Sequence, residues 1–197
     1  MSKLPPIEKI LFIDIETAPL YRSLDHLAQE DAILHDYWMD RYDKRRHEDK
    51  EAEDYFLNQS GIHALYARVV CIGLGYFHLQ VQESGKKWCW REEALYNLEE
   101  GNILEALKLR WERFARYATR TGDQFWGVCG HNIRNFDLPF LGRRFLIRGI
   151  APPAFWVEAQ YSQPWQLQSP MVRDTMHFWN LTSRENSFIS LEILAHA

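Results

Sequence analysis

The sequence predicts an α/β protein in which a mixed, five-stranded sheet carries helices on its faces. Apolar and β-branched runs at 9–16 and 67–81 are typical of buried strands. Apolar residues recur at helical spacing through 99–119, and shorter strands and helices alternate after it. Because three early strands precede this alternation, we expect an antiparallel hairpin on one side of the sheet and parallel crossovers on the other.

The first half of the chain is predicted to hold a strand, a charged excursion and a hairpin. "KILFIDIE" (9–16) is the first strand. The excursion, residues 21–60, is polar and helical in character, and "DRYDKRRHEDKEAED" mixes basic and acidic blocks. We interpret it as a solvated helix face or exposed segment, with a substrate-gripping arm as the alternative. Residues 67–81 and 86–91 are expected to pair across the turn "ESGKK".

The middle of the chain is predicted to alternate helices and strands. The amphipathic helix at 99–119 has Asn102 as its expected cap. "QFWGVCGHN" (124–132) is typical of a fourth strand. Residues 135–149 follow as a helix, and Gly149 is its expected C-terminal stop.

The last part is predicted to hold a loop, a strand and the start of a helix. A proline-rich loop at 151–170 leads to a fifth strand at 171–178. Ser190 is the expected cap of a final helix, "SLEILAHA". Because a helix of barely two turns is marginal by itself, we expect the sequence to stop inside an element, and docking of the short helix on the body is the alternative.

Composition and charge limit the classes of function. The chain has 197 residues, 46% of them hydrophobic, which suits one domain with a sizeable core. A net charge of −4 disfavours broad neutralisation of phosphates, so any nucleic-acid site should be local, such as a metal-filled acidic pocket. Three scattered cysteines, Cys71, Cys89 and Cys129, indicate thiols in a reducing compartment. Without a signal peptide or a run approaching the roughly 20 apolar residues of a membrane span, we expect a soluble cytoplasmic protein with no membrane partner.

Two acids interrupt the most apolar strand. Side chains alternate along a strand, so Asp14 and Glu16 share one face, with Cα atoms roughly 6–7 Å apart, and Ile13 and Ile15 point away. Repulsion and desolvation make such a pair costly inside a sheet. Pro19 is expected to place the pair at the end of the strand, where Mg²⁺ or Mn²⁺ could bind the carboxylate oxygens. Bonding of both acids to main chain or arginine is the alternative.

A second polar stretch, "GHNIRNFDLPFL" (130–141), lies where a strand is followed by a helix. Asp137 falls in the first helical turn, where the dipole favours a carboxylate, so helix capping and metal binding are both open. His131 and Asn132 are expected at the strand end, facing a cleft, and a structural role is the simpler interpretation of His131. The arginines after it form either a solvated helix face or phosphate contacts: Arg134, Arg143, Arg144 and Arg148.

Together, the two stretches resemble the DEDD superfamily of 3′–5′ exonucleases, which have a ribonuclease H-like fold. Residues 14–16 match the first motif of that superfamily, Asp-x-Glu, and residues 131–137 match the second, His-Asn-x-x-x-Phe-Asp. More narrowly, "FIDIETAP", "ARVVCIGLGYF", "GHNIRNFDLPFLGRR", "QPWQ" and "RDTMHFWN" are similar to predicted exonucleases related to the proofreading domain of family B DNA polymerases. The similarity runs from about residue 8 to 197, and only the excursion departs from it.

The resemblance implies two-metal hydrolysis of the terminal phosphodiester at the 3′ end of single-stranded DNA or RNA, with DNA favoured. It makes Asp14, Glu16 and Asp137 the catalytic acids and the ligands of two Mg²⁺ or Mn²⁺ ions. It also implies that the last nucleotide contacts Thr17, Ala18, Asn132 and Phe136. A polymerase or a repair protein is the kind of partner that such an enzyme serves.

One motif of this resemblance is missing. A Tyr or His a few residues before a final Asp should lie on a later helix, but no Y-x-x-x-D follows Asp137. Asp174 is the nearest substitute, although the resemblance gives it no metal-binding role. We therefore expect this chain to be weak or inactive and a longer natural protein to be active. A catalytically silent module that binds nucleic acid or protein is an alternative, as is a nuclease or phosphodiesterase acting on other ends or on RNA.

Overall fold

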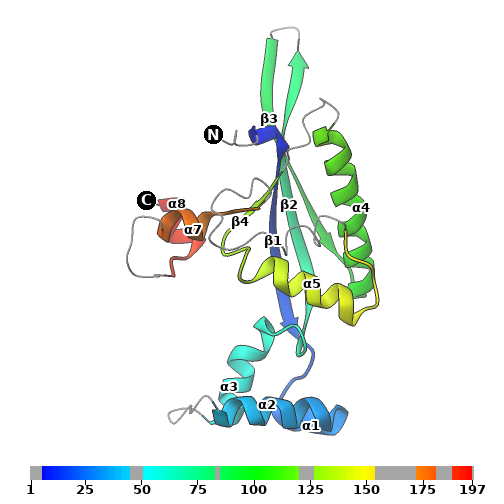
Figure 1. Cartoon of the computed structure of the whole chain (residues 1–197), viewed down its shortest axis with the longest axis vertical. Helices are drawn as coiled ribbons and strands as arrows, with labels where there is room; N and C mark the ends of the chain where they lie inside the picture. The colour runs from blue at the N-terminus through cyan, green and yellow to red at the C-terminus, as the bar shows by residue number, and fades with distance from the viewer. Residues whose placement is uncertain are drawn as a thin grey trace.

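The fold is built on a mixed sheet (Figure 1). The computed structural model describes residues 6–44, 51–82, 85–119, 127–153, 172–180 and 188–196. Within these residues the strands are β1 (Ile10–Pro19), β2 (Ala67–Gln82), β3 (Gly85–Tyr96), β4 (Gly127–Gly130) and β5 (Val172–Asp174), in the order β3-β2-β1-β4-β5. The first three strands pair antiparallel, and β4 lies parallel between β1 and β5. The predicted α/β class with a five-stranded mixed sheet is confirmed, and the arrangement is consistent with a ribonuclease H-like fold.

Two helices cover one face of the sheet. Helix α4 (Glu100–Thr119) and helix α5 (Asp137–Ile147) lie on the same side of the strands in Figure 1. Their apolar residues pack against the odd-numbered side chains of β1, and together these form the main core, which includes Leu11, Ile13, Ile15, Leu74, Leu104, Leu107, Trp111, Phe140, Leu141 and Phe145. Burial of this face fixes which residues of β1 point inward, and so exposes the other face of the strand.

The ends of several elements differ from the sequence prediction. Helix α4 begins at Glu100, so the prediction that Asn102 caps it is wrong. The side-chain Nδ2 of Asn102 instead donates to Asn97 Oδ1 at 3.3 Å, because Asn97 lies in the turn just before the helix. Gly149, with φ +67°, follows α5 as predicted, since the left-handed conformation favours glycine.

The C-terminal part is more helical than predicted. The expected strand at 171–178 is correct only for β5, because helix α7 (Thr175–Asn180) begins immediately after Asp174. Asp174 accepts a hydrogen bond from the Met176 amide at 3.0 Å, which favours the turn into this helix. Helix α8 (Leu191–His196) follows Ser190, whose hydroxyl accepts from the Ile193 amide as the predicted cap. The proline-rich loop lies mainly outside the described residues.

The charged excursion has a small core of its own. It contains α1 (Leu24–Glu30), α2 (Ala32–Lys44) and α3 (Ala52–Gln59), which lie beyond the ends of β1 and β2 in Figure 1. Short 3-10 turns occur at Ser60–Ile62 and, before β1, at Ile7–Lys9. The second core consists of Leu24, Leu27, Trp38, Tyr55, Phe56 and Tyr66. The helical prediction is therefore confirmed, but one side of these helices is buried rather than solvated.

Two findings on the described residues concern membrane spans and cysteines. None of their helices combines the length and the apolar character that crossing a membrane requires. Cys71, Cys89 and Cys129 are all free thiols, as predicted from their number and spacing.

Candidate active site

The acid pair lies on the side of β1 that faces away from α4 and α5. Asp14 and Glu16 are exposed, whereas Ile13 and Ile15 are 3% and 5% exposed. The predicted alternation is thus confirmed. Parallel pairing with β4 ends where Phe12 meets Cys129, so both acids lie beyond the end of β4.

The prediction that Pro19 places the acids at the end of their own strand is wrong. Strand β1 continues to Pro19, which still pairs with Ala67 of β2. Proline is tolerated because it is the last residue of β1 and, among the described residues, no strand pairs with β1 on its other side at that point. The register shifts between Glu16 and Thr17, directly after the second acid. The acids therefore sit at the end of the parallel half of the sheet and beside an irregularity in the antiparallel half.

The third acid, Asp137, meets the main chain between the other two. It is the first residue of α5, only 2% exposed, and its Oδ1 accepts from the Ile15 amide at 3.1 Å. Burial raises the pKa of Asp137 to about 7, and the negative charge of Asp14 adds to this effect. The hydrogen bonds from its own amide and from Ile15 act in the opposite direction. The Asp137 carboxylate thus meets the main chain of β1 between the two other predicted acids.

A braced turn delivers Asp137 to this position. The turn joins β4 to α5, and Asn132 in it has φ 57°, a conformation that Asn tolerates better than most residues. Asp174 is 2% exposed and accepts from the amides of Asn132 at 2.9 Å and Arg134 at 3.1 Å. Together with the Met176 amide, three main-chain donors satisfy Asp174. This carboxylate therefore stabilises the turn, and its commitment to main-chain donors argues against the fourth-ligand role.

His131 joins the turn to the C-terminal segment. Its Nδ1 lies 2.7 Å from Thr175 Oγ1, and its Nε2 donates to the Ile189 carbonyl at 2.6 Å. Both ring nitrogens are thus engaged, which confirms the structural interpretation of this residue. The side chain also lines a cleft, as expected from its place at the strand end.

The residues implied to grip a nucleotide have most of their groups engaged within the fold. The hydroxyl of Thr17 donates to the Gly61 carbonyl at 2.7 Å, and Ala18 pairs with β2. The side chain of Asn132 accepts from Asn135 at 2.9 Å. Phe136 packs against the main core beside Phe140, with ring centroids 5.6 Å apart. Thr17 and Ala18 follow Glu16 directly in the sequence, and Phe136 directly precedes Asp137.

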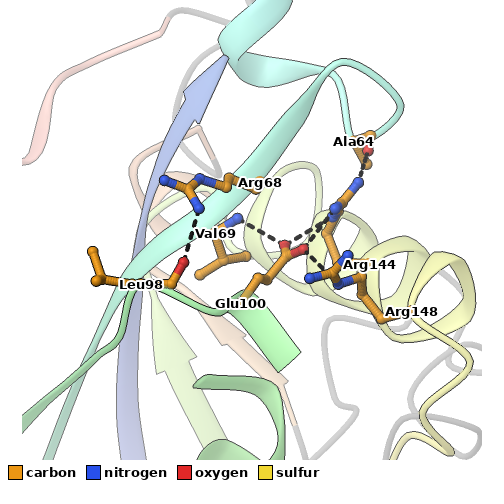
Figure 2. Close-up of polar contacts among 7 residues, drawn as sticks. All are labelled: Ala64, Arg68, Val69, Leu98, Glu100, Arg144 and Arg148. Carbon is orange, nitrogen blue, oxygen red and sulfur yellow. Dashed lines mark hydrogen bonds and ion pairs between the residues drawn. The ribbon is translucent and has the colours of Figure 1, made fainter. Parts of the chain in front are cut away.

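The predicted arginine surface is wrong for Arg144 (Figure 2). Arg144 is 3% exposed, and its Nε and Nη2 donate to the two carboxylate oxygens of Glu100 at 2.8 and 2.6 Å. Its Nη1 donates to the Ala64 carbonyl at 2.7 Å, and Arg148 approaches Glu100 at 3.4 Å. Arg134 is similarly turned inward, donating to the Val172 carbonyl at 2.8 Å. Arg144 thus bonds to α4 and to the segment before β2, and Arg134, in the turn before α5, bonds to β5.

Cation-binding potential rests on carboxylate oxygens. Asp14, Glu16 and Asp137 offer the hard donors that Mg²⁺ and Mn²⁺ prefer. Within the described residues, however, no group of three or more His, Cys, Asp and Glu side chains lies close enough to hold a metal ion. One oxygen of Asp137 is engaged by Ile15, so ion binding would require the exposed side chains of the acid pair to turn toward it.

A cleft beside Asp14 was not predicted from the sequence. It has a volume of about 570 Å³ and is lined by residues of β1, β2 and β3, among them Phe12, Gly73, Gly75 and Trp90. The glycines at alternate positions of β2 and the tryptophan on β3 are visible in the sequence. Only the register Phe77↔Trp90 shows that they share a face.

A scan of protein-family models and a search of curated proteins both find no match for this chain.

Proposed function

We propose that the chain is a metal-dependent 3′–5′ exonuclease that hydrolyses the terminal phosphodiester of single-stranded nucleic acid, with DNA favoured over RNA. One observation carries this proposal above the others. The buried carboxylate of Asp137 reaches the main chain between Asp14 and Glu16, beside the negative charge of Asp14. No described arginine or lysine bonds to Asp137, so a divalent cation is the chemistry that would relieve this charge.

The donor set supports Mg²⁺ or Mn²⁺. The cation would be held through the carboxylate oxygens of Asp14, Glu16 and Asp137. This set of donors contains no soft ligand. A cation bound there supplies a Lewis acid that polarises the phosphate and activates water. The chain itself contributes the positions of the acids: β1 fixes the pair on one face, and α5 fixes Asp137. The Asp174 carboxylate holds the turn between β4 and α5 in place.

The experiment that tests the proposal follows a 5′-labelled single-stranded DNA incubated with the chain and Mn²⁺. We expect products that shorten step by step from the 3′ end, and slower shortening on RNA. Asp14→Asn and Asp137→Asn should each lower the rate by at least about 100-fold. Asp137→Asn keeps an oxygen for the Ile15 amide, so a loss of activity would not reflect a lost hydrogen bond.

The matched control is Asp25→Asn, an exposed carboxylate on α1. It should digest DNA at the wild-type rate. Products that shorten from the 5′ end, or a rate unchanged by Asp14→Asn, would contradict the proposal.

A catalytically silent module remains as a second candidate, favoured by the absence of a ready three-ligand group among the described residues. Mn²⁺ separates the two candidates. If the site is live, Mn²⁺ should raise the melting temperature of the wild type but not of Asp14→Asn, because only the folded wild type binds the ion. Equal melting temperatures with and without Mn²⁺ in the wild type would favour the silent module.

A further inference from the structure

The sheet forms a cleft directly beside Asp14, on the face that α4 and α5 leave uncovered. Asp14 lines this cleft of about 570 Å³, so the cleft continues from the candidate active site. Its volume falls in the range of small-molecule sites, and its lining is mostly apolar with a few polar groups. The question is which part of a substrate would fit here.

The floor of the cleft is flat because its residues have almost no side chains. Asp14 pairs with Gly73 of β2, and Gly73 pairs with Ala94 of β3. A Cβ placed on Gly73 would meet only the Asp14 carbonyl oxygen, at 3.8 Å. The absence of side chains thus leaves room on the sheet without any packing need for glycine at this position.

Trp90 forms an aromatic wall that is held in one orientation. A Cβ on Gly75 would lie 2.2 Å from ring atoms of Trp90, so the indole rests directly on this glycine. The rings of Phe12 and Phe77 contact it with centroids 5.4 and 5.0 Å away. The indole Nε1 donates to Glu92 Oε2 at 2.9 Å. With these contacts the residue is still 45% exposed, and it is one that lines the cleft.

We propose that this cleft binds a nucleobase, with Trp90 as the stacking surface, of a nucleotide whose phosphate lies at Asp14 and Glu16. This rests on the proposed function. The row of Gly75 is two residues along β2 from that of Gly73, roughly 7 Å, which suits the span between the phosphate and base of one nucleotide. A flat, fixed ring matches a planar base, since bases of any sequence stack on aromatic side chains.

The charge of the cleft indicates which part of a nucleotide it would hold. The cleft carries Asp14, Glu92 and Glu93 and is otherwise mostly apolar, so it suits a neutral base rather than a phosphate. The phosphate would need the cation at the acid pair. An apolar peptide or a second copy of the chain would instead seek a deep groove for side chains, whereas Trp90 presents a flat surface beside a floor of glycine and alanine.

Photocrosslinking and affinity measurements with the 197-residue chain test this inference. A single-stranded oligonucleotide with iodouracil near its 3′ end is irradiated with the protein in Ca²⁺, and the adduct is mapped by fragmentation of the tryptic peptide 88–91. We expect the adduct on Trp90. Trp90→Leu should weaken binding of the oligonucleotide, measured by fluorescence anisotropy, by about 5- to 150-fold.

Two further variants protect the test from effects on folding. Trp88→Leu removes a tryptophan that is also 45% exposed but does not line the cleft, and it should change affinity by less than about twofold. Gly73→Val places a side chain on the floor whose Cβ meets only the Asp14 carbonyl at 3.8 Å, and a β-branched residue favours the strand. It should keep the melting temperature and weaken binding as Trp90→Leu does.

The outcomes separate this inference from the proposed function. Wild-type affinity in both Trp90→Leu and Gly73→Val, or an adduct elsewhere, overturns the nucleobase site, even if the chain digests DNA. A dimer that Gly73→Val dissociates, with no adduct on Trp90, also overturns it. An adduct on Trp90 that Gly73→Val abolishes supports the site, even if the wild type neither cleaves DNA nor binds Mn²⁺ and the nuclease proposal fails.

Discussion

Glu100 and Asp137 are both buried carboxylates at the first turn of a helix, yet the fold treats them differently. Glu100 is 1% exposed and receives two hydrogen bonds from Arg144 and one from the Val69 amide. Asp137 is 2% exposed and receives its tertiary hydrogen bond from the Ile15 amide. The charges that act on Asp137 are those of Asp14 and Asp174, which are both negative.

This difference indicates which buried acid serves the fold and which is open to chemistry. A paired acid such as Glu100 on α4 joins α5 through Arg144 and β2 through the Val69 amide (Figure 2). Asp174 is a third case, since three main-chain amides satisfy it. Among the residues described, Asp137 has neither an arginine partner, as Glu100 has, nor three main-chain donors, as Asp174 has. Carboxylates whose pKa is perturbed in this way are candidates for function.

The largest expected effect comes from breaking the compensated pair. Arg144→Met leaves Glu100 charged and buried without its main partner, so the free energy of unfolding should fall by about 3–5 kcal/mol. Urea unfolding at neutral pH measures this loss. Arg143→Met, on the exposed neighbour, should change it by less than about 0.5 kcal/mol.

A double variant sharpens the same comparison. Glu100→Leu with Arg144→Leu removes both charges, so it should recover much of the loss and leave mainly the Val69 amide and the Ala64 carbonyl without partners. If Arg144→Met alone lowers the free energy of unfolding by less than about 1 kcal/mol, the pair of Glu100 and Arg144 does not stabilise the fold as expected.

The next effect tests the uncompensated acid through pH. The pKa of Asp137 is raised from 3.8 to about 7 in the folded chain, so the folded state binds the proton more tightly than the unfolded state. The stability from this group is therefore fully present below the unfolded pKa. It is lost as pH rises through about 7, by about 4 kcal/mol in total.

Asp137→Asn should remove this loss. Its free energy of unfolding, measured in urea between acidic and mildly alkaline pH without divalent ions, should vary less with pH than that of the wild type. Above neutral pH it should exceed the wild-type value, because the variant has no charge to bury. Asp14→Asn should also reduce the pH dependence, since it removes the neighbouring negative charge. Parallel curves for wild type and Asp137→Asn would show that Asp137 is as well compensated as Glu100.

The periodicity of apolar residues predicted much of this fold, because burial of one sheet face determines which positions of a strand or helix are apolar. Strand β1 and helix α4 have strong patterns and both are present, although β1 continues three residues beyond its expected end, to Pro19. The strand predicted at 171–178 was too long, since the tertiary hydrogen bonds of Asp174 and the start of α7 are not visible in a short apolar run. The buried side of the excursion was missed because its aromatic residues lie within highly charged segments.

The site was predictable only in part for a related reason. Alternation places Asp14 and Glu16 on one face, and the turn sequence places Asp137 at a helix start. The contact between Asp137 and Ile15 joins residues 122 positions apart, and no local pattern encodes it. Arg144 illustrates the opposite failure: its helical position suggested a surface, but its burial depends on Glu100, which lies 44 residues away.

The smallest effect concerns the turn that holds Asp137 against the charge of Asp14. Asn132 has φ 57°, so Asn132→Ala should cost about 1 kcal/mol by placing an ordinary residue in the left-handed region. Asn132→Gly removes that penalty but also loses the bond from the Asn135 side chain. Asn135→Ala loses the same bond alone and is the control, with all three measured by urea unfolding. If Asn132→Gly costs as much as Asn132→Ala, the side-chain bond rather than the backbone conformation sets the turn. In that case Asp137 is positioned chiefly by Asp174 and by its own bond to Ile15. Asp137, whose charge is not compensated, then depends for its position on Asp174, whose charge is compensated by main-chain amides.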